Sequence, residues 1–538
     1  MLAYGKAQQR WEGVIVASLL LLFIVNATFS IYHKSFTYDE TAHFRYGRQL
    51  LDLESDRFDD SKMPFSVINA LVYKLAVSIF PRQVENIWQA ERLGRLATIA
   101  FSVLVGFIVY LWAREWGRFA GLTALFLYVF EPTILAHSRL VTTDIYIMGM
   151  VMASVFTYWR FLQQPGWKRG VLAAVVLGLA QLAKYTSVFL FPLLLVLTVI
   201  HQLPIFLSLA RDERKHSLRN RILKDLAIGL GFVLVALLII NIGFLFNRTF
   251  LPFGEYDFRS SLFQSIQANA GLLNAVPVPT PYPYLEGLDW IVHRERTGEG
   301  YGRIYLLGEL RPHGEGFPGY FLVAMLFKLP VGLLLLTILA IVVYTRNASW
   351  EAFRERDMFL FLPWLMFTVY FNFFFRAQIG IRFILPSFPF MLVFCGRIAE
   401  SWRHMRLDLR VGFVVLLISI VPSVLSYYPH YLSYFNAFVR DRTRAYRLLA
   451  DSNLDWGQNK ALVRSFLEAH PDYIFEPLEP TVGTIVVEVN KVVGVREGPE
   501  LYAWLRECDE PVGHFAYSYL IFEFSQADLE NVPFCTEP

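Results

Sequence analysis

Long apolar runs separated by short polar turns are the main pattern along this chain. A helix needs roughly 20 mainly apolar residues to cross a hydrocarbon core about 30 Å thick. Eleven runs reach or approach that length, at residues 14–32, 93–112, 119–136, 144–162, 170–184, 186–202, 225–246, 318–344, 358–375, 382–398 and 411–428. The fifth and sixth runs are short, and Lys184 separates them. We therefore expect an all-α polytopic membrane protein with about eleven transmembrane helices.

The positions of Lys and Arg in the loops predict the orientation of these helices. Cytoplasmic loops are the ones enriched in basic residues. Alternate loops, all on the side of the N-terminus, carry Arg114, Arg118, Lys168, Arg169, Arg211, Arg214, Lys215, Arg219, Arg221, Arg346, Arg354, Arg356, Arg403, Arg406 and Arg410. The pattern predicts a cytoplasmic N-terminus and an extracytoplasmic C-terminus. No convincing cleavage site follows the first run, so we interpret it as a retained helix rather than a secretory signal.

The remaining polar segments predict two outer loops and a tail. Residues 1–428 form the membrane body, with outer loops at 33–92 and 247–317. The first loop contains an amphipathic helix at 63–73 that is expected to lie on the membrane surface. The second is rich in Pro, Gly and Tyr, which favours a structured loop without long helices. Residues 429–538 are expected to form a small extracytoplasmic α/β domain, with strands at 481–490 and 514–524 and a short helix at 500–508.

Composition supports a membrane protein and excludes one class of partner. Of 538 residues, 55% are hydrophobic and 18% are charged, whereas soluble domains average about 25% charged residues. A net charge of +3 is too small to indicate nucleic acid. Cys508 and Cys535 both lie in the tail, where an oxidising compartment would allow them to pair. Two unrelated free thiols are an equal alternative, because the spacing does not decide between them.

Acidic residues at the outer helix ends are the first candidates for chemistry. Asp39 and Glu40 follow the first run directly, and His43 lies one helical turn beyond Asp39. Such a carboxylate can accept a proton from an attacking hydroxyl or hold a metal that binds a phosphate. Its alternative role is to cap a short helix. Asp144 begins an apolar helix, where an ionisable group is usually functional or paired; a structural pair with Arg139 is the alternative.

Cations on the same outer side form a second group. Lys62, Arg139, Lys184 and Arg382 all lie where the positive-inside tendency disfavours basic residues. An anionic partner such as a lipid phosphate would explain them, although an interfacial lysine like Lys62 is also common without a ligand. Together with the carboxylates, these cations suit a reaction on a lipid-linked phosphate at the outer membrane surface.

Six short motifs, in order along nearly the whole chain, resemble one family. They are Tyr38-Asp39-Glu40, Asp60-Ser61-Lys62-Met63-Pro64, Leu140-Val141-Thr142-Thr143-Asp144, Ala183-Lys184-Tyr185-Thr186, Gly380-Ile381-Arg382-Phe383-Ile384-Leu385-Pro386 and Asp451-Ser452-Asn453-Leu454-Asp455-Trp456-Gly457-Gln458. The set is similar to the membrane glycosyltransferases of the GT-C type, and in particular to bacterial relatives of protein O-mannosyltransferases and of the lipid A aminoarabinose transferase. From the residues alone, the last motif favours a turn that caps a following helix.

The resemblance implies an enzyme of a bacterial plasma membrane. It would transfer a mannose-like hexose or a pentose from a polyprenyl-phosphate donor to an extracytoplasmic protein, lipid or glycan, with inversion at the anomeric carbon. Asp39 would act as the general base or orient the acceptor, with Glu40 and Asp144 as further acidic site residues. Lys62, Lys184 and Arg382 would bind the donor phosphate. Arg139 lies in none of the motifs, and we add it to this group because of its charge and its predicted side. The aminoarabinose transferase has a metal-binding carboxylate where this chain has Ser61, so a divalent cation is left open.

Two other functions compete with this one. A secondary transporter or a lipid-linked sugar flippase is expected to have inverted repeats and charged residues near the middle of its spans. The sequence contains no repeat of its halves, and its candidate residues cluster at the outer helix ends. A non-catalytic assembly subunit is the third possibility, and it would not require the outer acidic pair.

Overall fold

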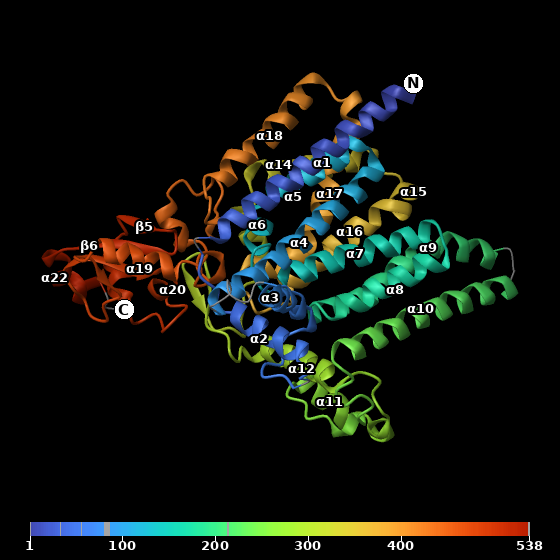
Figure 1. The fold of residues 1–538 in the computed structure, drawn as a ribbon, viewed down its shortest axis with the longest axis horizontal. Coiled ribbons are helices and arrows are strands. Elements are labelled where there is room, and N and C mark those ends of the chain that lie inside the picture. Colours follow the sequence, from blue (N-terminus) through green and yellow to red (C-terminus); the bar gives the residue numbers. More distant parts are fainter. Residues whose placement is uncertain (1, 33, 55, 80–86, 212–214, 536–538) are drawn as a thin grey trace.

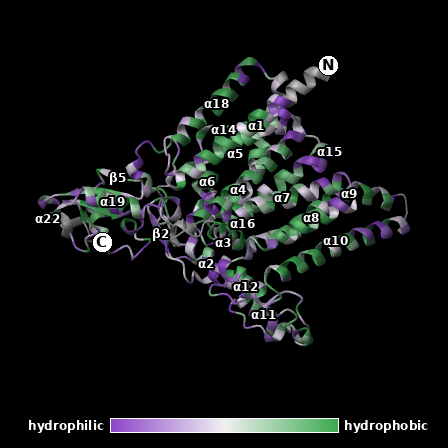
Figure 2. Ribbon diagram, viewed as in Figure 1, coloured by the Kyte–Doolittle hydropathy of each residue, from purple (hydrophilic) through white to green (hydrophobic). Residues whose placement is uncertain are grey.

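The chain folds into a bundle of apolar helices with a smaller domain at one end. The computed structural model describes residues 2–32, 34–54, 56–79, 87–211 and 215–535. In Figure 1 the N-terminus of α1 lies at one end of the bundle, and α2, α12 and the C-terminal strands lie at the other. Figure 2 shows that the helices of the bundle are predominantly hydrophobic, whereas the C-terminal domain is mixed. An integral membrane protein follows from this arrangement.

The bundle helices coincide with the predicted apolar runs. They are α1 (Leu2–Ile31), α4 (Ile87–Ala113), α5 (Arg118–Val129), α6 (Pro132–His137), α7 (Asp144–Gln163), α8 (Trp167–Gln181), α9 (Leu190–Arg211), α10 (Lys215–Gly243), α13 (Tyr320–Lys328), α14 (Val331–Asn347), α15 (Trp350–Ala352), α16 (Met358–Phe373), α17 (Phe388–Gly396) and α18 (Leu407–Leu425). Among the described residues, seven helices are long and apolar enough to cross a membrane, or eight with one bent pair. The helices α5, α8 and α16 are shorter, so the count of eleven stays a prediction.

The bent pair is α13 and α14, which meet at an angle of 117°. Leu329 is extended and Pro330 follows it directly. Proline lacks a backbone N–H and disfavours helical geometry in the residue before it, so the helix ends there and a new one begins. The predicted run at 318–344 is therefore two helices rather than one straight span.

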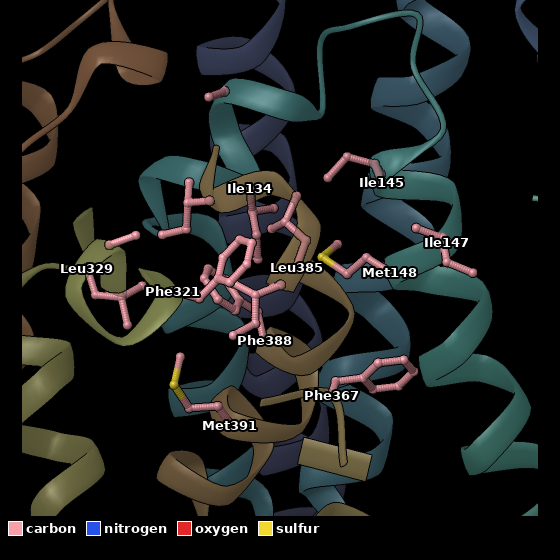
Figure 3. Packing of buried hydrophobic residues seen from close by; sticks show 14 of the residues in the cluster. Ile134, Ile145, Ile147, Met148, Phe321, Leu329, Phe367, Leu385, Phe388 and Met391 are labelled. Carbon is pink, nitrogen blue, oxygen red and sulfur yellow. The ribbon is translucent and has the colours of Figure 1, made fainter. Parts of the chain in front are cut away.

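The centre of the bundle is packed with large apolar side chains from helices that are distant in sequence. Figure 3 shows Ile134 of α6 and Met148 of α7 beside Phe321 of α13 and Phe388 of α17. All four are buried. The span at 381–400 is 89% buried, whereas the α10 span is only 22% buried. The helix α17 is thus a central helix, and α10 lies at the periphery, where it faces lipid.

The two predicted outer loops contain short helices. The first holds α2 (Glu40–Leu51) and α3 (Val67–Ile79), and the second holds α11 (Ser261–Asn269), α12 (Tyr282–Thr297) and an antiparallel pair, β1 (Ile304–Leu306) and β2 (Glu309–Arg311). The 16 residues of α12 correct the expectation of a loop without long helices. Pro281 precedes this helix and Pro283 lies in its first turn, where a missing N–H costs nothing.

The C-terminal domain has a four-stranded sheet in the order β3-β4-β6-β5. Its elements are β3 (Ile474–Phe475), β4 (Gly483–Glu488), β5 (Gly513–Phe515), β6 (Tyr519–Phe524), α19 (Lys460–Ala469), α20 (Val489–Val492), α21 (Ala503–Cys508) and α22 (Gln526–Cys535). The predicted strand at 514–524 is an antiparallel pair, because Ala516 and Tyr517 turn the chain with positive φ angles. The side chains of Cys508 and Cys535 lie outside the described part of the structure, so their pairing stays a prediction.

The segment between α18 and α19 packs into the helix bundle. The Lys328 ammonium donates hydrogen bonds to the backbone oxygens of Leu432, at 2.8 Å, and Asn453, at 2.6 Å. Asn436 donates to the backbone oxygens of Leu326 and Leu329. These contacts carry the polar motif at 451–458 from the sheet domain to the end of the membrane body.

Candidate functional site

A cavity of about 330 Å³ lies where the outer loops, the bundle and the C-terminal domain meet. It contains Asp39, Lys62, Asp144, Lys184 and Arg382, five of the seven predicted site residues. The other lining residues are Tyr38, His43, Ser61, Thr142, Thr143, Tyr185, Thr186, Ile291, Arg294, Gly300, Tyr301, Gly302, Phe375, Ile379, Phe383, Asp451, Asp455, Trp456, Asn490, Val495 and Arg496. Residues from all six motifs and from both outer loops therefore share one site.

Asp39 faces a guanidinium across this cavity. It immediately precedes α2, yet its side chain makes no capping bond to that helix. Instead its Oδ2 lies 3.1 Å from Nη1 of Arg382, and the Asp39 side chain remains 41% exposed. The Arg382 guanidinium also lies over the Trp456 ring, 3.7 Å from its centroid. Stacking and ion pairing together fix the guanidinium plane, which a lysine would not reproduce.

Asp144 and Lys184 form a second charged pair. The Lys184 Nζ donates to Oδ1 of Asp144 at 2.8 Å, and the Thr142 hydroxyl donates to its Oδ2 at 3.2 Å. His137 Nδ1 lies 3.9 Å from the same oxygen. Lys184 also lies over the Phe383 ring. Asp144 therefore pairs with Lys184 rather than with Arg139, and its buried charge holds that ammonium at the cavity wall.

Lys62 reaches the cavity from the turn before α3. Its Nζ lies 3.3 Å from Oδ2 of Asp59, whose Oδ1 accepts hydrogen bonds from the backbone and hydroxyl of Ser61. His43 lies nearby and its Nδ1 is 3.2 Å from the Ser66 hydroxyl. Burial, with the Lys62 charge, lowers the pKa of His43 to about 3, so this imidazole is neutral.

Glu40 lies outside the cavity lining. Its carboxylate accepts two bonds from Arg95, at 2.8 and 2.7 Å, and one each from the backbone N–H groups of Thr37 and Val141. The side chains of Glu40 and Arg95 are 1% and 0% exposed. All the lone pairs of this carboxylate are thus engaged in joining α2 to α4, and none is directed at a ligand.

Arg139 also lies outside the cavity lining. It is buried, and its Nη1 donates to the backbone oxygen of Ser30 at 2.6 Å. The structure therefore brings together three of the four predicted phosphate-binding cations and separates the fourth. Arg139 follows α6, but its side chain turns toward the end of α1.

The C-terminal segment supplies one wall of the cavity. Asp451, Asp455 and Trp456 belong to the motif that favours a capping turn, and the sequence alone gave them no role in the site. Arg496, which follows α20, also lines the cavity and donates to the Tyr38 hydroxyl. The Tyr38 backbone N–H donates to the Trp456 oxygen at 3.2 Å, so the tail holds the chain directly before Asp39. No local sequence signal points to Arg496.

The side chains of Asp455, which lines the cavity, and Glu488, which is outside the lining, lie side by side. Burial, together with the charge of the neighbouring Asp455, raises the pKa of Glu488 to about 8. Burial also raises the pKa of Asp455. Arg496 lies 3.4 Å from Glu488 and opposes the shift without cancelling it. Burial likewise raises the pKa of Asp451 to about 6. This wall therefore holds carboxyl groups that take up protons near neutral pH, unlike an ordinary exposed aspartate.

The acidic residues do not converge as metal ligands do. Within the described parts of the chain, no group of three or more His, Cys, Asp or Glu side chains is arranged to hold a metal ion. Asp60, next to the position of the metal carboxylate in the resembled transferase, turns toward Arg57 and Arg259. A divalent cation at this site stays an open possibility rather than a property of these residues.

Comparison with known proteins gives one family match in the sequence. The model of the dolichyl-phosphate-mannose-protein mannosyltransferase family matches residues 69–256, which confirms the resemblance that the motifs indicate. A search of curated proteins gives no match.

Solved structures with a similar fold include those of two transferases. ArnT from Cupriavidus metallidurans, bound to undecaprenyl phosphate, is 16% identical, with coverage of 96% of this chain and 98% of that chain and a TM-score of 0.30. The Archaeoglobus fulgidus oligosaccharyltransferase, tethered to an acceptor peptide, is 12% identical, with coverage of 78% and 54% and a TM-score of 0.44. The chain spans about half the length of that oligosaccharyltransferase. At these scores neither likeness carries a functional argument.

Proposed function

We propose that this protein is a membrane glycosyltransferase that moves a sugar from a polyprenyl-phosphate donor to an acceptor outside the cytoplasm. The sugar is a mannose-like hexose or a pentose, and the acceptor is a protein, lipid or glycan. The match to the mannosyltransferase family model over residues 69–256 supports the reaction class. The predicted orientation, with basic loops on the N-terminal side, supports an extracytoplasmic site.

One observation carries this proposal: a partly exposed carboxylate and three cations line the same cavity at one end of the bundle. Asp39 is the carboxylate, and Lys62, Lys184 and Arg382 are the cations. A nucleophilic displacement at a sugar phosphate needs a base on the acceptor and positive charge on the departing phosphate. A transporter has no need for this combination, and these residues lie at the helix ends rather than in the middle of the membrane.

In the proposed step, Asp39 removes the proton of the acceptor group as the acceptor atom attacks the anomeric carbon. The bond between that carbon and the phosphate oxygen breaks, and its electron pair leaves with the polyprenyl phosphate. A single in-line displacement inverts the anomeric configuration. Arg382, Lys62 and Lys184 stabilise the charge that develops on the phosphate. Arg382 pairs with Asp39 at 3.1 Å, so a phosphate that binds this guanidinium competes with the carboxylate and frees it to act as a base.

Three of the predicted acidic and basic residues receive different roles in this proposal. Asp144 positions Lys184 through their 2.8 Å contact rather than touching the acceptor. Glu40 and Arg139 stabilise the packing around the site, because each is bonded away from the cavity. The base is therefore assigned to Asp39 alone.

The test compares purified wild type with Asp39→Asn and Asp52→Asn protein in detergent. Asp52 is an exposed aspartate at the end of α2 that pairs with Lys74 at 3.2 Å, so it is a matched control outside the cavity. A panel of polyprenyl-phosphate sugars is supplied with lipid, glycan and peptide acceptors, and released polyprenyl phosphate is measured by mass spectrometry.

We expect release with one donor, a loss of about 10²–10⁴-fold in Asp39→Asn, and no loss in Asp52→Asn. Full activity in Asp39→Asn would remove the base assignment. A folded wild-type protein that releases no polyprenyl phosphate with any donor and acceptor would overturn the proposed function itself.

A further inference from the structure

A second and larger cavity lies at the opposite end of the bundle, between α9 and α10. Its volume is about 640 Å³, and the end of α7 forms its floor. Small-molecule pockets usually measure about 300–1,000 Å³. Phe161 of α7, Leu194 of α9 and Phe232 of α10 are among the apolar side chains that line it. None of the residues of the candidate active site belongs to it.

The two helices that form its walls are open to the hydrocarbon core. The α9 span is 28% buried and the α10 span 22% buried, and α10 packs mainly against α8. At Gly229, which lines the cavity, an added Cβ would meet no atom within 4 Å. An apolar groove of this kind inside a membrane holds acyl chains rather than water, since water would find few polar partners there.

One end of the groove is polar and carries an excess of positive charge. Arg221 and Lys224 line it together with a single carboxylate, Asp225. The Arg221 guanidinium donates to Oε1 of Gln202 at 2.6 Å and lies 3.4 Å from Asp225, so it is held at the groove. Within the described part of the chain, Lys224 makes no ion pair. In Figure 2 hydrophilic residues mark this end of α10.

We propose that this groove is a binding site for one anionic phospholipid in the leaflet on the side of the N-terminus. Its acyl chains lie between α9 and α10, and its phosphate pairs with Arg221 and Lys224. An apolar channel with two cations at its membrane-surface end matches the shape and charge of such a lipid. The site is independent of the proposed transfer reaction, which takes place at the other end of the bundle.

The test uses full-length protein in nanodiscs of equal parts phosphatidylglycerol and phosphatidylcholine, with retained lipids counted by native mass spectrometry. Wild type is expected to retain one phosphatidylglycerol per chain. Gly229→Trp fills the groove and is expected to lose this lipid. Gly231→Trp is the matched control, because Gly231 is equally open but lies outside the cavity lining.

A charge variant tests the other half of the proposal. Arg221→Gln with Lys224→Gln is expected to lower the ratio of retained phosphatidylglycerol to phosphatidylcholine to that of the bilayer. The exposed Arg219→Gln, outside the lining, should leave the ratio unchanged. The proposal is overturned if Gly229→Trp retains as much phosphatidylglycerol as the wild type, or if Gly231→Trp loses as much of it as Gly229→Trp. It is also overturned if the wild type retains phosphatidylcholine or a prenyl lipid in place of phosphatidylglycerol.

Discussion

The buried pair of Glu40 and Arg95 separates a structural role of Glu40 from a catalytic one. Glu40 accepts four hydrogen bonds, two of them from Arg95, and both side chains are fully buried. Glu40→Gln keeps the shape of the side chain but leaves the Arg95 guanidinium without a counter-charge. Breaking one partner of a buried ion pair costs about 3–5 kcal/mol. We therefore expect a large fall in stability from this one substitution.

This cost converts to a shift in the melting temperature. An unfolding entropy of about 2.1 cal/mol/K per residue gives about 1.1 kcal/mol/K for the whole chain, so the expected drop is about 3–5 °C. The assay is thermal unfolding of detergent-purified protein, followed by intrinsic fluorescence, beside transferase activity measured well below the transition. Glu40→Gln should melt earlier and retain most of its activity per folded molecule.

A second variant tests the cause of this loss. Glu40→Gln combined with Arg95→Met removes the unpaired charge, so the double variant should recover about half of the lost stability. The remainder reflects the backbone N–H groups of Thr37 and Val141, which lose a charged acceptor, and the backbone oxygens of Lys34 and Ser35, which lose Arg95 as a donor. If Glu40→Gln melts at the wild-type temperature but has no transferase activity, the structural argument is refuted and Glu40 returns to the catalytic site.

Three further outcomes follow from the same structure. Arg382→Gln should lower kcat by about 10²–10³-fold, as expected when one group that stabilises transition-state charge is lost. Gly47→Ala should destabilise the protein by about 1–3 kcal/mol, because the new Cβ would lie 2.3 Å from the Ser66 backbone oxygen. The raised pKa of Glu488 means that the native state binds the extra proton. Stability should therefore fall as pH rises from about 4.5 to about 8, and Glu488→Gln should gain on the order of 2–4 kcal/mol at pH 9.

Each of these has a control and an outcome that would contradict it. Arg376 carries the other guanidinium of the same turn and is exposed outside the cavity lining, so Arg376→Gln should leave kcat unchanged. An equal loss of kcat in Arg376→Gln and Arg382→Gln would argue against a specific role for Arg382. Gly13→Ala meets no neighbour within 4 Å, so equal melting shifts at both glycines would contradict the packing argument. Asp451 leaves a residual slope below about pH 6, so a slope in Glu488→Gln as steep as that of the wild type up to pH 8 would contradict the assignment to Glu488.

The sequence by itself determined the helices and their general placement. An apolar run long enough to cross a bilayer must satisfy its backbone hydrogen bonds internally, so it becomes a helix whatever its neighbours are. The same local reasoning found the strand β4 from its β-branched residues. It failed at α12, where the prolines at the helix start are typical of a loop, and at β5 and β6, which a three-residue turn divides.

Only the tertiary structure decided which charged residues share a site. Successive residues of a helix point about 100° apart, so Asp39 and Glu40 can face different surroundings although they are adjacent. The partner of Glu40 is 55 residues away, and the partner of Asp39 is 343 residues away. Arg496 reaches Tyr38 only because the tail folds back onto the bundle. Contacts over such separations depend on how whole elements pack, and local sequence patterns do not contain that information.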